Sequence, residues 1–138
     1  MPHYSYEHTF SANGVKSNQE QAVMECAWGI LTNVDISFQW GTSRRVHVHL
    51  DEALHQIFPT NPNGDYAFNG YTIHVTGKYE LLPSTRKIYL RGWNEGAYDH
   101  TIAVAFEVLP KEDVYAVPSA IDNLRRLWER MLYGSRLS

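Results

Sequence analysis

Residues 34–50 carry the sequence VDISFQWGTSRRVHVHL, in which apolar and polar side chains alternate on both sides of a central turn. A period of two places alternate side chains on one face of a strand, so this stretch predicts two half-buried strands. The turn Gly41-Thr42-Ser43 between them indicates a hairpin. The apolar positions are Val34, Ile36, Phe38 and Trp40 before the turn, and Val46, Val48 and Leu50 after it.

Further runs with a period of two flank this stretch and predict more strands. They span residues 4–10, 71–81, 88–90 and 102–108. Residues 65–68 are predicted to pair with 71–75 in a second hairpin, because Asn69-Gly70 supplies the two positive-φ positions of a type I′ turn. Gly77 lies inside the longest run, and a glycine inside a strand predicts a bulge.

Two stretches show the apolar spacing of amphipathic helices. The first, over residues 18–32, follows Ser17 and Glu20, which match a capping box. The second spans residues 118–133, and Trp128 on its apolar stripe is predicted to be buried in the core. A short helix is also predicted after Asp51.

These elements predict a single α+β domain over residues 1–138. It would contain a mostly antiparallel sheet of about six to seven strands, with the two main helices packed on one face. The order resembles the helix-grip arrangement, in which a curved antiparallel sheet wraps a long C-terminal helix around a cavity. The resemblance covers the order of elements alone, and the helix after Leu50 departs from it, so it assigns no functional residues.

The composition indicates an ordinary globular protein, with 43% apolar residues, 20% charged residues and a net charge of −3. Mild acidity argues against a dedicated nucleic-acid binder. The single cysteine, Cys26, excludes an intrachain disulfide. No signal peptide begins at Met1, and no segment approaches the ~18–20 apolar residues that cross a bilayer. We therefore expect a small soluble cytoplasmic protein without membrane or nucleic-acid partners.

His47 and His49 are the candidate metal ligands, because residues two apart on a strand point the same way. Two ligands do not complete a zinc site, and the chain has no HExxH or paired-cysteine motif. The alternative interpretation is a polar outer face of a half-exposed strand. We expect the second interpretation, with no metal and no cofactor.

Asp99, His100 and Glu107 are candidates for acid–base chemistry, but adjacent strand residues point to opposite faces. No nucleophile accompanies them, because Cys26 lies on an apolar stripe and no GxSxG motif is present. An enzyme or a small-ligand carrier is therefore the alternative function, with a cavity between the sheet and the C-terminal helix. The residues expected to line this cavity are His74, Tyr79, His100 and Glu107.

Aromatic residues make up 13% of the chain, and four of them near turns are candidate binding residues. These are Trp40, Tyr89, Trp93 and Tyr98. Gly92 and Gly96 bracket Trp93, so we expect its side chain to project from a turn; the alternative is that it folds back over the sheet. The sequence predicts a non-catalytic binding or regulatory protein, acting as a homodimer on a protein partner or a small apolar ligand through an aromatic surface or pocket.

Overall fold

The computed structural model describes residues 3–83, 86–110 and 128 of the chain. Within these residues, eight strands form two antiparallel four-stranded sheets. The first sheet has the order β1-β8-β3-β6 and the second has the order β2-β7-β4-β5. The strands are β1 (His3–Phe10), β2 (Glu20–Glu25), β3 (Ile30–Phe38), β4 (Val46–Glu52), β5 (His55–Phe58), β6 (Thr72–Glu80), β7 (Lys87–Asn94) and β8 (His100–Leu109).

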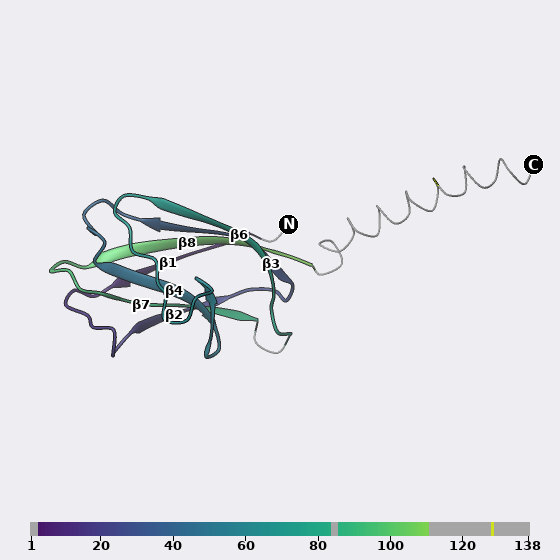
Figure 1. Cartoon of the computed structure of the whole chain (residues 1–138), viewed down its shortest axis with the longest axis horizontal. Coiled ribbons are helices and arrows are strands. Elements are labelled where there is room, and N and C mark those ends of the chain that lie inside the picture. The colour runs from purple at the N-terminus through teal and green to yellow at the C-terminus, as the bar shows by residue number, and fades with distance from the viewer. Residues whose placement is uncertain (1–2, 84–85, 111–127, 129–138) are drawn as a thin grey trace, which may run out of the picture.

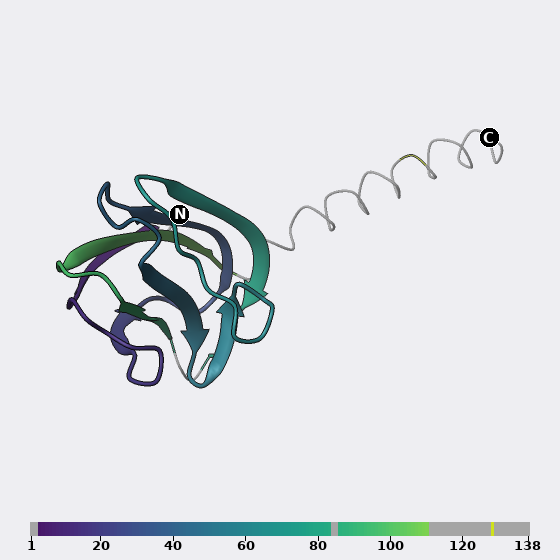
Figure 2. The same ribbon diagram turned by 60° about the vertical axis from the view of Figure 1, so that its left-hand side comes forward.

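The two sheets pack face to face as a sandwich, with β1, β3, β6 and β8 in one layer and β2, β4 and β7 in the other (Figure 1). After a rotation of the view, the second sheet lies across the inner face of the first (Figure 2). Apolar side chains from the inner faces fill the space between them, and burial of each stabilises the fold by about 1.5–3 kcal/mol. The fully buried side chains include Phe10, Met24, Leu31, Ile36, Leu50, Ile88, Leu90 and Ile102.

The predicted α+β class with two main helices is wrong, because the described residues form sheet and contain no helix element. In place of the helix over residues 18–32, β2 pairs with β7 and β3 begins at Ile30. Within β2, Met24 is fully buried while Val23 is 45% exposed, which is the period of a strand. Pairing with β7 supplies the hydrogen bonds of this segment, so tertiary structure overrides its helical pattern.

The short helix predicted after Asp51 is also wrong. β4 continues to Glu52, turns through Ala53 at a φ of 53°, and returns as β5. The predicted helix over residues 118–133 lies outside the described residues except for Trp128. The prediction of a buried Trp128 is wrong, because that side chain is 62% exposed.

The predicted hairpins are replaced by crossings between the sheets. β3 and β4 lie in different sheets, so the turn after Trp40 connects layers. Residues 65–68 form no strand with β6, which pairs with β3 instead. An alternating pattern is the same whether the next strand pairs or crosses, so it cannot separate these two cases. The resemblance to the helix-grip arrangement is therefore also wrong, since that arrangement has one sheet and this structure has two.

Other expectations are confirmed. The runs at residues 4–10 and 102–108 belong to β1 and β8, which pair with each other along their length. The register of β3 against β6 shifts where Leu31 faces Tyr79 and Asn33 faces Thr76, so the irregularity includes Gly77.

Tyrosine hydroxyl groups of β1 close one side of the sandwich. The Tyr4 hydroxyl accepts a hydrogen bond from the Ala27 backbone N–H at 2.9 Å. The Tyr6 hydroxyl donates to the Glu25 carbonyl oxygen at 2.5 Å. These contacts join β1 of the first sheet to the end of β2 and the residues that follow it in the second sheet. Among the described residues, no helix is long and apolar enough to cross a bilayer.

Candidate binding surface at one end of the sandwich

Three loops meet at one end of the sandwich: residues 39–45, residues 65–71 and residues 95–99. Backbone hydrogen bonds connect them, from the Gly70 N–H to the Gln39 carbonyl at 3.1 Å and from the Glu95 N–H to the Arg45 carbonyl at 2.9 Å. The Gln39 side chain also accepts from the Thr101 N–H at 3.3 Å. The loops are therefore held against each other by their own backbone.

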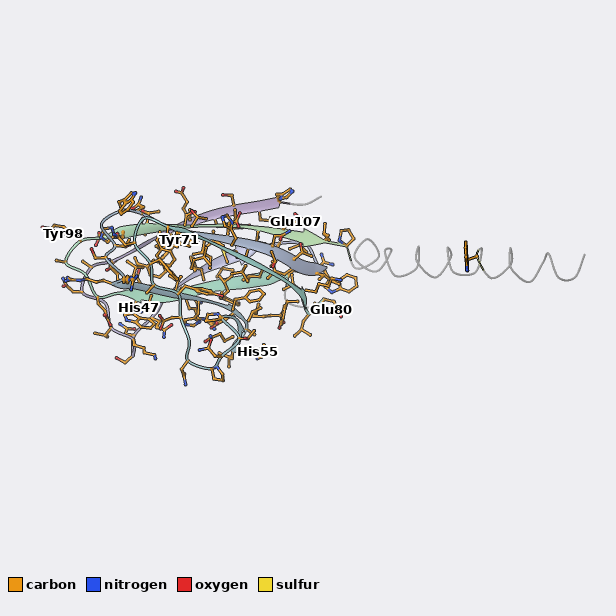
Figure 3. The ribbon with its side chains drawn as sticks, turned by 45° about the horizontal axis from the view of Figure 1, so that its top comes forward. His47, His55, Tyr71, Glu80, Tyr98 and Glu107 are labelled. Atoms are coloured by element: carbon orange, nitrogen blue, oxygen red, sulfur yellow. The ribbon has the colours of Figure 1, made fainter. Side chains whose placement is uncertain are left out.

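Four large aromatic side chains are exposed on these loops, and we call them the aromatic end. The exposed fractions are 80% for Trp40, 78% for Tyr98, 56% for Tyr71 and 36% for Phe68. Tyr98 lies at one end of the molecule, Tyr71 lies between it and the middle, and His55, Glu80 and Glu107 lie toward the other end (Figure 3). Exposed aromatic groups of this size on one end are a feature of interaction sites.

The position of the Trp40 ring is fixed by Gly70. Gly70 has a φ of 58°, and a Cβ atom at this position would overlap the Trp40 ring. The ring therefore lies directly against the backbone of the second loop and presents its other surface to solvent. A glycine is required here both for the positive φ and for the close approach.

A hollow of about 580 Å³ lies beside the aromatic rings. Phe68 anchors it to the core, because its ring centroid lies 6.0 Å from that of Phe38. On its other side, the Phe68 ring lies 5.6 Å from that of Tyr71. This volume is in the range of small-molecule sites in proteins. The hollow is lined by Arg44, Phe68, Asn69, Tyr71 and Ile73.

The loop that carries Arg44 has an unusual backbone. Ser43 and Arg44 have φ values of 50° and 62°, a left-handed conformation that costs non-glycine residues about 1–3 kcal/mol each. Asn69 stabilises it, because its Oδ1 accepts hydrogen bonds from the Gly41 N–H at 2.9 Å and the Ser43 N–H at 3.2 Å. Thr42 is buried, and its hydroxyl lies 2.7 Å from the Phe68 carbonyl oxygen.

Of the predicted binding residues, Trp40 and Tyr98 belong to the aromatic end and the other two do not. Trp93 is 4% exposed, so the expectation that it projects from a turn is wrong. It lies in β7 with Gly92 and Asn94, and its ring stacks on His47 at 4.6 Å and 6°. Tyr89 lies on the outer face of the same sheet, and its ring centroid is 4.7 Å from the Arg91 guanidinium carbon.

The outer face of the second sheet carries a set of histidine, charged and aromatic side chains, which we call the histidine face. Its residues are His47, His49, Asp51, Arg91 and Trp93. The predicted common direction of His47 and His49 is confirmed, with Val46, Val48 and Leu50 fully buried on the opposite side. His47 contacts Asp65 at 2.9 Å through Nδ1 and Glu95 at 3.4 Å through Nε2.

His49 is buried and both of its ring nitrogens have partners. Nδ1 lies 2.7 Å from Asp51 Oδ1, and Nε2 lies 2.6 Å from the Gln19 side-chain oxygen. Each imidazole therefore has its own carboxylate partner. No group of three or more His, Cys, Asp or Glu side chains suited to a metal ion is found among the described residues.

Asp51 connects His49 to Arg91. The Arg91 guanidinium donates to Asp51 Oδ2 at 2.7 Å and to the Ala53 carbonyl at 2.6 Å. Burial alone would raise the pKa of Asp51, but the hydrogen bonds from His49 and Arg91 outweigh it and lower that pKa. The hydrogen bonds from His49 and Arg91 therefore stabilise the ionised form of Asp51.

The other sequence candidates are not brought together. Asp99 accepts from the Ala12 N–H at 2.7 Å, and Glu107 lies 3.9 Å from His3. His74 contacts Asp35 at 2.6 Å on the first sheet. The Tyr79 hydroxyl donates to Glu52 at 3.0 Å, and burial beside this carboxylate raises the pKa of Tyr79 to about 12. His100 lies at the start of β8, beside Gly41. Of the four residues expected to line an enzyme cavity, His74 and Glu107 share the outer face of the first sheet, and Tyr79 and His100 lie away from them.

Cys26 packs against the core as predicted. Burial, with Glu52 nearby, raises the pKa of its thiol to about 11. A thiol with this pKa is protonated at neutral pH and is a poor nucleophile.

No protein-family model matches this chain, and no curated protein matches it. The crystal structure of FLHE is similar in fold at 10% sequence identity and a TM-score of 0.47, covering 76% of this chain and 94% of that chain. The crystal structure of PirA is similar at 12% identity and a TM-score of 0.46, covering 75% of this chain and 94% of that one. Likenesses at this level carry no argument about function.

The sequence did not identify Arg44, Phe68, Asn69 and Tyr71 as parts of one surface. Asn69-Gly70 predicted a type I′ turn, which needs a positive φ at both residues, but only Gly70 has one. The Gly70 N–H donates instead to the Gln39 carbonyl, next to Trp40. A pairing between residues 39–43 and 69–70 is a long-range contact that a local pattern does not contain.

Proposed function

We propose that this protein is a non-catalytic binding protein that recognises a protein partner through the aromatic end. The observation that carries the proposal is the high exposure of Trp40 and Tyr98, 80% and 78%, on loops held by hydrogen bonds. Tryptophan, tyrosine and arginine are the residues most enriched among interface hot spots. Exposed rings on a preorganised backbone lose little conformational freedom on binding.

The separation of the acid–base candidates supports a function without catalysis. The candidate histidines His47, His49 and His74 each contact a carboxylate. The proposal places the protein in the cytoplasm, since its one cysteine cannot form an intrachain disulfide. A homodimer remains part of the proposal, and sedimentation equilibrium of Trp40→Ala would show whether the aromatic end forms it.

The test compares protein capture by the wild type and by the variants Trp40→Ala and Tyr98→Ala. Quantitative mass spectrometry would identify the captured protein, and calorimetry with that purified protein would give the dissociation constant. We expect each variant to weaken binding by about tenfold or more, the effect of losing a hot-spot aromatic.

Leu54→Ala is the matched control, because Leu54 is 94% exposed in the turn between β4 and β5. It removes exposed apolar surface without touching the aromatic end. Equal losses in Leu54→Ala and Trp40→Ala, or unchanged binding in both aromatic variants, would contradict the proposal.

A further inference from the structure

Arg44 supplies a positive charge at the hollow of the aromatic end. Within the described part of the chain, no carboxylate oxygen lies within 4.0 Å of its guanidinium. Asp65 and Glu95, acidic residues of the other two loops, both contact His47. A guanidinium presents a planar fork of N–H donors that matches a carboxylate, so this group is suited to an anion of that shape.

Asn69 adds a second donor. Two backbone N–H groups, those of Gly41 and Ser43, point at its Oδ1, and this identifies which end of the side-chain amide is oxygen. The NH2 group is therefore the other end of the amide, and no acceptor for it is found among the described residues. Asn69 lines the hollow together with Arg44.

The remaining lining is apolar. Phe68 and Tyr71 contribute aromatic rings, and Ile73 contributes an aliphatic side chain. Phe68 is packed on the core residue Phe38, which fixes one wall. The hollow thus combines an apolar wall with a cation and an amide donor. This is the pattern of sites in which a few polar side chains fix the orientation of an otherwise apolar ligand.

We propose that the hollow binds a small free carboxylic acid with an apolar body. Its carboxylate would accept hydrogen bonds from the Arg44 guanidinium and the Asn69 NH2 group. Its aromatic or branched aliphatic body would pack on Phe68, Tyr71 and Ile73. Charge complementarity selects an anion, and the size of the hollow, about 580 Å³, suits a whole small molecule.

This inference adds a small-molecule ligand to the proposed protein partner, and its test needs no partner because it uses the isolated protein. The probes are 3-phenylpropionate and its uncharged amide, titrated into the full chain and followed by calorimetry and by tryptophan fluorescence. We expect the acid to bind about tenfold or more tightly than the amide, because only the acid pairs with the guanidinium. Failure here leaves the partner test on Trp40 and Tyr98 unaffected.

Two variants remove the polar contacts while keeping the loop. Arg44→Ala removes the cation. Asn69→Asp keeps an oxygen for the Gly41 and Ser43 N–H groups but replaces the NH2 donor by a negative oxygen. Each is expected to weaken binding of the acid by about tenfold or more. The matched control is Arg45→Ala, which removes the same charge one residue away, at a side chain that does not line the hollow; it should change binding by less than about twofold.

Circular dichroism and a melting curve establish that each variant is folded. Equal binding of acid and amide would overturn the proposal, as would equal losses in Arg44→Ala and Arg45→Ala. A peptide ending in phenylalanine with a free C-terminal carboxylate is the last arm. If this peptide binds and 3-phenylpropionate does not, the ligand is a polypeptide terminus and the proposal of a free acid is wrong.

Discussion

The aromatic end and the histidine face carry the residue types that usually signal function, but they differ in whether those residues have partners. On the histidine face, His47 and His49 each contact a carboxylate, Arg91 donates to Asp51, and Trp93 is 4% exposed. On the aromatic end, Trp40 and Tyr98 are about four-fifths exposed. Side chains whose contacts are already filled within the chain stabilise the fold, and those left open are available to a ligand.

The histidine face is also where charge is buried. Removing one member of a buried, hydrogen-bonded pair leaves the other without compensation, which is far more costly than losing an exposed contact. Substitutions on the two surfaces should therefore separate stability from binding.

Trp93→Ala should have the largest effect. The ring is buried against His47, and its N–H donates to Glu95 at 3.0 Å. We expect a loss of about 3–4 kcal/mol of unfolding free energy, typical of a truncated buried aromatic. Urea denaturation followed by circular dichroism measures it. A midpoint equal to that of the wild type would show that the histidine face does not support the fold.

Asp51→Asn should cost about 2 kcal/mol at pH 7, since it removes the charge that His49 and Arg91 stabilise. The pKa of Asp51 is lowered by folding, so its contribution is present above its ordinary value of 3.8 and is lost as the pH falls below that value. Urea titrations of both proteins at pH 7 and near pH 3 measure the difference, which should shrink in acid. A difference that is constant with pH would mean that packing, and not charge, holds this residue.

Trp40→Ala should have the smallest effect on stability, below about 0.5 kcal/mol, because an exposed ring gains little from folding. The same urea titration checks it, with Trp93→Ala as the comparison. A loss as large as that of Trp93→Ala would place Trp40 among the residues that hold the loops together and remove the contrast between the two surfaces.

Local alternation predicted β1, β3, β4 and β8 because each has one face in the core, and burial then enforces a period of two. The segment of β2 was misassigned because its apolar residues also fit a helical stripe, and the buried face of the strand carries just one large apolar side chain, Met24, beside the small Ala22. The aromatic end was predicted in part. Trp40 and Tyr98 stand near turn residues. The conformation of the loop that carries Arg44, however, depends on hydrogen bonds that the Gly41 and Ser43 N–H groups donate to Asn69, a residue far along the chain.

The pairing of β1 with β8 has a consequence for biosynthesis. His3 lies opposite Glu107 and Phe10 opposite His100, so β1 can pair with β8 only after all the strands between them have been synthesised. Of the strands adjacent in sequence, only β4 and β5 pair with each other. Topologies dominated by such distant contacts fold slowly, in milliseconds to seconds. During translation, β1 therefore remains unpaired until β8 has been made. Glu7 lies between the inward-facing Tyr6 and His8, and its charge is of the kind that discourages pairing of an exposed strand edge with another chain.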